Sequence, residues 1–256
     1  MTDLAAVVLA AGSGTRLRPL TDLLPKALCP VNNVALVDHA IGRAKEITDD
    51  IAVNTWHQSE KVIAHLEGKV HLSVEESPLG TAGALGNLGN WLDGRSVVVQ
   101  NADAWHRTDL TSFLRNWDGT RPRLLVTEDR RRGDFGRWRF CGVSVLPWND
   151  VAGLRAEPSG LYELLWARQF HAGQLEFVAL DGPYFDCGTP ADYLGANLVA
   201  NGGQSVIGEG CVVDGSIERC VLWPGVHVAS KEHLSESIRA TDDITIDARA
   251  GMIQVS

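Results

Sequence analysis

The sequence predicts an α/β fold with a doubly wound, mostly parallel sheet, followed by a short β-helical tail. Short apolar runs, such as those at residues 4–9 and 96–100, are typical of strands buried on both faces of a parallel sheet. Segments with helical spacing of apolar residues alternate with these runs, which predicts β-α units. Near Gly202 the helical spacing stops, and apolar residues recur every six positions. That period is typical of hexapeptide β-helices.

The first half of the chain alternates between the two kinds of element. Strands are expected where apolar and β-branched residues form short runs, at 4–9, 51–54, 70–74 and 96–100. Helices are expected where apolar residues share one face, at 37–46, 59–66, 81–91 and 110–117, the third of them interrupted by glycines. Ligands of such sheets bind beyond the carboxyl ends of the strands.

The second half is less regular and ends in the tail. Strands are expected at 123–127, 140–146 and 175–180, and helices at 160–170 and 191–200. Thr189 and Pro190 form a typical N-cap and N1 pair for the last helix. We expect a catalytic domain at 1–201 and, at 202–256, a left-handed β-helix stub of hexapeptide type. An ordinary β-rich tail is the alternative.

Composition and charge narrow the class of protein. The 256 residues include 23 Lys and Arg against 32 Asp and Glu, a net charge of −9, which argues against nucleic acid or an anionic membrane as main partner. No apolar run approaches the ~18 residues of a membrane span. The first strand lacks the basic flank of a signal peptide. The five cysteines form no C-x-x-C pair. We expect a cytoplasmic enzyme or binding protein.

A glycine-rich loop follows the first strand. Its glycines allow backbone N–H groups to approach a phosphate. The dinucleotide fingerprint G-x-G-x-x-G does not fit because position 17 is Leu, and the P-loop pattern does not fit either. What remains is a glycine loop followed by the cations Arg16, Arg18 and Lys26, a pattern that suits phosphate binding. An ordinary glycine turn with basic residues nearby is the alternative.

Two aspartates follow predicted strands. Asp103 comes just after the strand at 96–100, and Asp186 lies between a strand and a helix start. Carboxylates from separate elements that face a phosphate loop suit Mg²⁺, because that ion takes few protein carboxylates and completes its shell with water and phosphate oxygens. The alternative for each aspartate is a helix cap or turn residue.

The glycine loop belongs to a longer motif. Residues 9–31, LAAGSGTRLRPLTDLLPKALCPV, resemble the signature of the sugar-1-phosphate nucleotidyltransferases, or NDP-sugar pyrophosphorylases. Further segments resemble family motifs in order: EESPLGTAGA at 75–84, QNAD at 100–103 with Ala102 in place of Gly, FCGVSVL at 140–146, and the segment 184–197. The overall resemblance is to the compact branch that contains mannose-1-phosphate guanylyltransferases and N-acetylmuramate-1-phosphate uridylyltransferases.

The resemblance implies a Rossmann-like nucleotidyltransferase fold and a role for each matching residue. It implies that Arg16 binds the β- and γ-phosphates and that Lys26 neutralises the α-phosphate in the transition state. It assigns Asp103 and Asp186 to Mg²⁺. It assigns the remaining residues to the nucleotide (Ala11, Gly12, Ser13, Gly14, Thr15, Glu75 or Glu76, Gly80, Thr81) and to the sugar phosphate (Gly142, Asp134).

The resemblance also implies the reaction. We expect transfer of NMP from an NTP (GTP, UTP or dTTP) to a sugar 1-phosphate, which gives an NDP-sugar and pyrophosphate. The family's E-K-P segment before the sugar strand has no counterpart between Val126 and Gly136. A nucleotide- or nucleotide-sugar-binding subunit without turnover is therefore the alternative. The tail is expected to do no chemistry and to pack on the catalytic domain or on a second subunit of a homo-oligomer.

Overall fold

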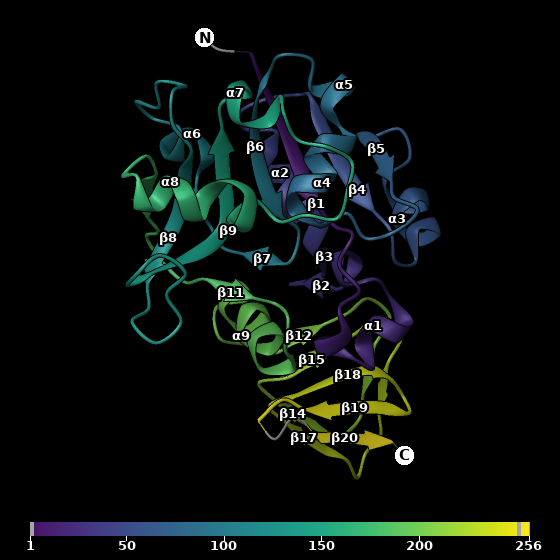
Figure 1. Cartoon of the computed structure of the whole chain (residues 1–256). Coiled ribbons are helices and arrows are strands. Elements are labelled where there is room, and N and C mark those ends of the chain that lie inside the picture. Colours follow the sequence, from purple (N-terminus) through teal and green to yellow (C-terminus); the bar gives the residue numbers. More distant parts are fainter. Residues whose placement is uncertain (1–2, 250–251, 256) are drawn as a thin grey trace. The chain divides into compact units, whose positions relative to one another are not determined.

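The computed structural model describes residues 3–249 and the backbone of 252–255 (Figure 1). The chain divides into two compact units. The first unit contains the chain up to residue 13 and residues 37–184, and the second contains residues 14–36 and the chain from 185 onward. A catalytic domain ending at residue 201 stays a prediction.

The first unit is built on a seven-stranded sheet in the order β10-β8-β9-β6-β1-β4-β5. Val7 of β1 pairs in parallel register with Val99 of β6 and with Ala52 of β4, whereas β9 runs antiparallel to both β6 and β8. The predicted doubly wound, mostly parallel sheet is confirmed. The strands of this unit are β1 (Leu4–Leu9), β4 (Ile51–Thr55), β5 (His71–Val74), β6 (Ser96–Asn101), β7 (Ala104–Trp105), β8 (Arg123–Glu128), β9 (Trp138–Leu146) and β10 (Glu176–Ala179).

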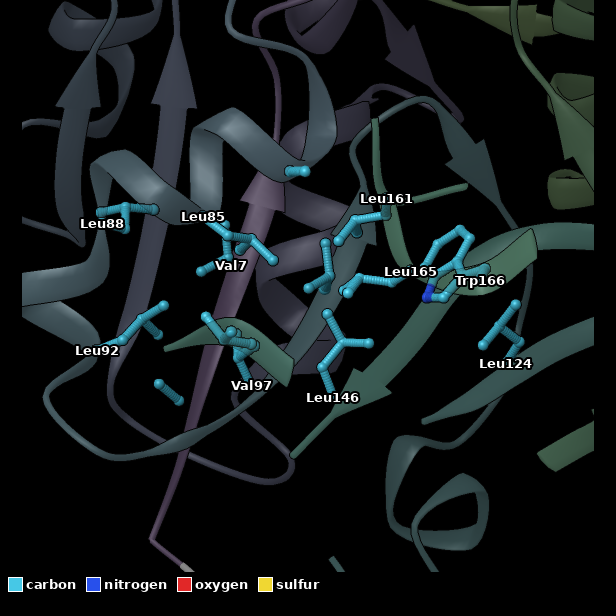
Figure 2. Packing of buried hydrophobic residues seen from close by; sticks show 14 of the residues in the cluster. Val7, Leu85, Leu88, Leu92, Val97, Leu124, Leu146, Leu161, Leu165 and Trp166 are labelled. Atoms are coloured by element: carbon cyan, nitrogen blue, oxygen red, sulfur yellow. The ribbon is translucent and has the colours of Figure 1, made fainter. Parts of the chain in front are cut away.

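Helices cover both faces of this sheet. On one face, Leu85 and Leu161 pack with Val7 and Val97 in the core that Figure 2 shows. On the other face, Phe113 packs with Val98. In the described part of the chain, no helix is both long and apolar enough to span a membrane. The helices are α2 (Leu36–Ala44), α3 (Ser59–Leu66), α4 (Gly80–Asn87), α5 (Gly89–Leu92), α6 (Leu110–Phe113), α7 (Trp148–Val151), the π-helical turn η3 (Tyr162–Trp166) and α8 (Ala167–His171).

The glycines that interrupt α4 have a packing reason. Gly80, Gly83 and Gly86 lie on the face of α4 against which the chain at 155–159 runs. A Cβ at Gly80 would lie 2.5 Å from the Ser159 carbonyl oxygen, and one at Gly83 would lie 2.2 Å from that of Glu157. The amide of Ala82 donates to the Ser159 carbonyl at 3.0 Å. Glycine is therefore needed for close backbone approach, not for flexibility.

The second unit joins an N-terminal segment to α9. The Thr189 hydroxyl accepts from the Asp192 amide at 3.2 Å and caps this helix. The hydroxyl of the fully buried Tyr193 donates to the Pro30 carbonyl, and Asn197 accepts from the Asn32 amide at 2.9 Å. The elements are η1 (Thr15–Leu17), α1 (Leu20–Leu23), η2 (Lys26–Leu28), β2 (Pro30–Val31), β3 (Val34–Ala35), β11 (Phe185–Asp186) and α9 (Pro190–Ala200).

The first part of the tail consists of short strands in stacked parallel ladders, whereas its last strands, β18 to β20, pair antiparallel with one another, which a hexapeptide repeat does not predict. Val206 pairs with Val221, which in turn pairs with Ile238, and two further parallel ladders join β13 to β16 and β14 to β17. This pairing is consistent with a β-helix stub, whose handedness stays a prediction. The strands are β12 (Val206–Ile207), β13 (Val212–Val213), β14 (Ser216–Glu218), β15 (Val221–Leu222), β16 (His227–Val228), β17 (His233–Ser235), β18 (Ser237–Thr241), β19 (Ile244–Asp247) and β20 (Met252–Val255).

Candidate functional site

A pocket of about 280 Å³ lies in the first unit, at the carboxyl ends of β1 and β6. Strand order reverses at β1, because β4 and β6 flank it on opposite sides. Open α/β sheets bind ligands at such a switch point. Most of the residues of this unit that were predicted to contact the nucleotide line the pocket. The full lining is Leu9, Ala11, Gly12, Asn54, Glu75, Pro78, Gly80, Thr81, Asn101 and Asp103.

Glu75 holds two walls of this pocket together. It is 5% exposed, and its Oε1 accepts from Asn54 Nδ2 at 2.7 Å while its Oε2 accepts from the Leu79 amide at 3.0 Å. Asn54 Oδ1 in turn accepts from the Ala10 amide at 2.8 Å. Both carboxylate oxygens therefore fix backbone around the pocket. Asn54 was not predicted, although its place near the end of a buried strand gives a usable signal.

The other predicted residues of this unit have clear local roles. Thr81 Oγ1 accepts from the Leu161 amide at 2.8 Å. Gly142 has a φ of +78°, and a Cβ there would lie 2.4 Å from that of Ala104. The Asp134 carboxylate accepts from the Phe140 amide at 2.8 Å. The structure thus shows Gly142 and Asp134 shaping β9 and the turn before it, and their contact with a sugar phosphate stays a prediction.

A second pocket of about 280 Å³ shares Leu9, Thr81 and Asn101 with the first. The rings of Phe140 and Trp166 meet there at 5.0 Å between centroids. π-Helical turns are frequent at functional sites, and η3 forms one side of this pocket. The remaining lining residues are Val99, Ser144, Leu161, Tyr162 and Glu163.

The second unit brings two cations to one carboxylate. Lys26 Nζ lies 3.6 Å from Asp186 Oδ1, and Arg16 Nη2 lies 3.6 Å from Asp186 Oδ2. The Lys26 side chain is 9% exposed, against 66% for Arg16. Gly14, with a φ of +64°, allows the loop to turn above Thr21, whose hydroxyl donates to the Gly14 carbonyl at 2.9 Å. This group presents clustered positive charge, as binding of a polyphosphate requires.

Two buried cysteines, Cys29 and Cys141, are poorly suited to nucleophilic catalysis. Burial raises the pKa of the Cys29 thiol to about 12, although Lys26 opposes the shift. Burial likewise raises the pKa of Cys141 to about 12. Both thiols stay protonated at neutral pH, so covalent catalysis by a thiolate is not available to them.

Comparison with known proteins decides the family. The sequence model of the nucleotidyl transferase family matches residues 5–137. The chain belongs to this family. The chain is 33% identical over 111 residues to the bifunctional protein GlmU of Methanococcus vannielii, a match covering 43% of this chain and 27% of that protein. It is 24% identical to the probable mannose-1-phosphate guanylyltransferase 2 of Arabidopsis thaliana, with 91% and 85% coverage.

The chain spans 59% of the GlmU protein of Methanococcus aeolicus, to which it is 24% identical. Solved structures share the fold. A putative glucose-1-phosphate thymidylyltransferase from Bacillus anthracis has a TM-score of 0.68 at 19% identity, with 77% of this chain and 95% of that chain covered. The HddC protein of Yersinia pseudotuberculosis, complexed with GMP-PN, has a TM-score of 0.63 at 20% identity, with 78% and 100% covered.

The donor chemistry of this nucleotidyl transferase fits Mg²⁺ without a dedicated cage. In the ranges that the structure describes, no group of three or more His, Cys, Asp or Glu side chains could hold a metal ion. Asp103 lines the pocket of the first unit, and Asp186 lies beside two cations in the second. Single carboxylates beside a glycine loop or beside cations suit an ion that takes one or two carboxylates together with substrate phosphates.

Proposed function

We propose that this nucleotidyl transferase transfers NMP from an NTP to a sugar 1-phosphate, which gives an NDP-sugar and pyrophosphate. The pocket at the switch point carries the proposal most directly, because glycine-loop backbone and the Asp103 carboxylate line it together. The cationic group of Arg16 and Lys26 supports it. The names of the related proteins support the same reaction class.

The proposed step is an in-line displacement at the α-phosphorus. An oxygen of the sugar phosphate attacks, the bond from the α-phosphorus to the bridging oxygen breaks, and pyrophosphate leaves with that oxygen. The attacking oxygen already carries negative charge, so no general base is needed. The obstacles are misorientation and repulsion between anions. Lys26 would stabilise the charge that grows on the α-phosphoryl oxygens, and Arg16 would hold the β- and γ-phosphates.

Mg²⁺, when bound, neutralises charge on phosphate oxygens. Asp103 and Asp186 are the residues that we propose as its ligands. The residues of the glycine loop, Gly12 to Thr15, would orient the phosphates through their backbone amides.

Pyrophosphate release tests the proposal. The full chain is incubated with Mg²⁺, one of GTP, UTP or dTTP, and a panel of hexose 1-phosphates, and pyrophosphate is measured with a coupled assay. We expect release that depends on both substrates. The missing E-K-P segment favours a second candidate, a binding subunit without turnover. Calorimetric binding of a nucleotide with no pyrophosphate from any pair would establish that candidate instead.

Replacing either aspartate should weaken the dependence on Mg²⁺. Asp103→Asn and Asp186→Asn keep side-chain shape but remove the charge that an Mg²⁺ ligand needs. We expect the half-saturating Mg²⁺ concentration to rise by about tenfold or more in each variant, the usual scale for altering a metal site. Titration of turnover with Mg²⁺ measures this, and melting curves check folding. If the turnover of a variant depends on Mg²⁺ concentration as that of the wild type does, the replaced aspartate is a turn residue and not a metal ligand.

The second pocket would receive the sugar. It adjoins the nucleotide pocket, and it combines aromatic faces with polar edges, as sugar sites do. Glu163 is the charged residue among its described lining residues. A sugar with an additional carboxylate would meet repulsion there, so we propose a neutral hexose 1-phosphate as acceptor.

Glu163→Gln should reduce this selectivity. We expect the wild type to prefer glucose or mannose 1-phosphate over N-acetylmuramate 1-phosphate by about tenfold in kcat/KM, which corresponds to about 1.4 kcal/mol. The variant should narrow that ratio mainly by accepting the carboxylate sugar better. Steady-state kinetics with both acceptors measures the ratio. A wild-type preference for the carboxylate sugar contradicts the proposed acceptor class.

A further inference from the structure

Arg43, on α2, is a buried cation whose hydrogen bonds go to neutral oxygens. It is 8% exposed. Its Nε donates to Gln100 Oε1 at 3.1 Å, its Nη1 to the His106 carbonyl at 3.4 Å, and its Nη2 to the Ala104 carbonyl at 3.3 Å. Burial lowers the pKa of Arg43 to about 10, so the guanidinium stays charged at neutral pH. A buried charge is costly, and here it binds one short stretch of chain.

That stretch carries Asp103. Gln100 lies in β6, before Asp103, and Ala104 and His106 come after Asp103. The guanidinium therefore contacts the chain on both sides of this aspartate. Gln100 is fully buried, and its Nε2 donates to the Ala40 carbonyl of α2 at 3.1 Å. The turn with Asp103 is therefore tied to α2 through two side chains.

Two further contacts restrict the same turn. The Ala102 amide donates to the Leu9 carbonyl at 3.0 Å, which fixes the turn to the end of β1. Ala104 packs over Gly142, where a Cβ would lie only 2.4 Å from its own. The neighbouring His106 is 3% exposed, and burial with Arg43 lowers its pKa to about 2, so it stays neutral. Arg43 is thus a charged side chain that contacts this turn through three hydrogen bonds.

We propose that Arg43 is a positioning residue, whose contacts with the carbonyls of Ala104 and His106 and with Gln100 fix the Asp103 carboxylate for the metal-bound nucleotide. The proposal rests on the proposed function, because that function gives Asp103 its ligand. Lysine cannot replace the planar fork of donors that reaches three oxygens at once. Arg43→Lys keeps the charge and loses the geometry.

Arg123 provides a matched control. It is also 8% exposed, and it also binds backbone carbonyls, those of Phe113 at 3.1 Å, Arg115 at 2.9 Å and Asn116 at 3.3 Å. These carbonyls belong to the end of α6 and to the residues just after it, and none of these residues lines either pocket. Arg123→Lys should therefore lower the melting temperature, as we also expect of Arg43→Lys, without changing metal binding.

The measurement is Mn²⁺ binding, followed by electron paramagnetic resonance with excess NTP and no acceptor. We expect Arg43→Lys to weaken Mn²⁺ binding by about tenfold or more, the scale found when groups that orient a metal ligand are removed. Arg43→Met should weaken it further. If that variant does not fold, Gln100→Met removes one of the three contacts and should weaken binding by a smaller factor.

A double-mutant cycle tests whether Arg43 affects Mn²⁺ binding through Asp103. In an Asp103→Asn background, Arg43→Lys should change Mn²⁺ binding by less than about twofold, because the ligand that it positions is already gone. An undiminished effect in that background overturns the proposal. So does wild-type Mn²⁺ binding in Arg43→Lys, or an equal loss in Arg123→Lys. Failure of the proposed function would appear separately, as no pyrophosphate release by a wild type that binds Mn²⁺ and NTP normally.

Discussion

Lys26→Ala is expected to lower kcat by about 10²–10³, equivalent to ~2.7–4 kcal/mol, while the nucleotide Kd changes little. Charge on the α-phosphoryl oxygens grows toward the transition state, so a cation there matters most at that point. The structure supports such a role because Lys26 is 8% exposed and is held 3.6 Å from Asp186. Single-turnover kinetics gives the chemical step, and calorimetry gives Kd.

Lys61→Ala is the control for this variant. Lys61 lies on α3, where its ammonium donates to Gln58 Oε1 at 2.7 Å at an exposed position. Removing its charge should leave kcat unchanged. A Lys26→Ala enzyme with kcat within about threefold of the wild type contradicts the assigned role, because threefold is only about 0.65 kcal/mol.

The sheet was predictable because strands that are buried on both faces consist of continuous runs of apolar residues. The strands at 4–9 and 96–100 correspond to β1 and β6, whose carboxyl ends carry the glycine loop and Asp103. The position of Asp103 in the pocket followed from the same argument. Strand, loop and carboxylate are close in sequence, so local reasoning was sufficient.

Contacts between distant segments were not predictable in this way. The sequence suggested only that the glycines interrupt α4, whereas in the structure they allow the backbone at 155–159 to pack directly against this helix. Arg43 and Asn54 are polar residues inside apolar segments, and their partners lie in other elements. Glu75 lines the pocket, and its two internal hydrogen bonds show a structural role that spacing alone could not indicate; its contact with the nucleotide stays a prediction.

The tail shows a third case, because the sequence predicted the kind of structure and, only coarsely, what it packs against: the catalytic domain or a second subunit. Stacked parallel ladders of strands are present as expected. The six-residue period does not indicate that Trp223 of the tail contacts α9, or that α9 contacts the segment after Lys26. Trp223 Nε1 donates to the Tyr193 hydroxyl at 3.0 Å, and that hydroxyl donates to the Pro30 carbonyl. The tail therefore supports the backbone close to Lys26.

Trp223→Ala is consequently expected to destabilise the second unit by about 3–5 kcal/mol, the usual cost of truncating a buried tryptophan. Trp223 is 5% exposed, and its loss would leave the fully buried Tyr193 beside a cavity. The melting temperature should fall by roughly 10 °C or more, since about 1 kcal/mol shifts a unit of this size by several degrees. Trp223→Phe keeps most of the ring, lacks the N–H donor, and should lose less.

The same variant distinguishes an effect on the stability of the fold from an effect on the catalytic step. If the tail only supports the fold, Trp223→Ala should keep kcat within about threefold of the wild type when each protein is assayed well below its own melting temperature. Calorimetric melting and pyrophosphate release measured on the same samples give both quantities. Unchanged melting would show that the tail does not stabilise α9. A folded variant with a large loss of kcat would show that the chain from Trp223 through Tyr193 to Pro30 controls the position of Lys26, and not merely the stability of the unit that contains it.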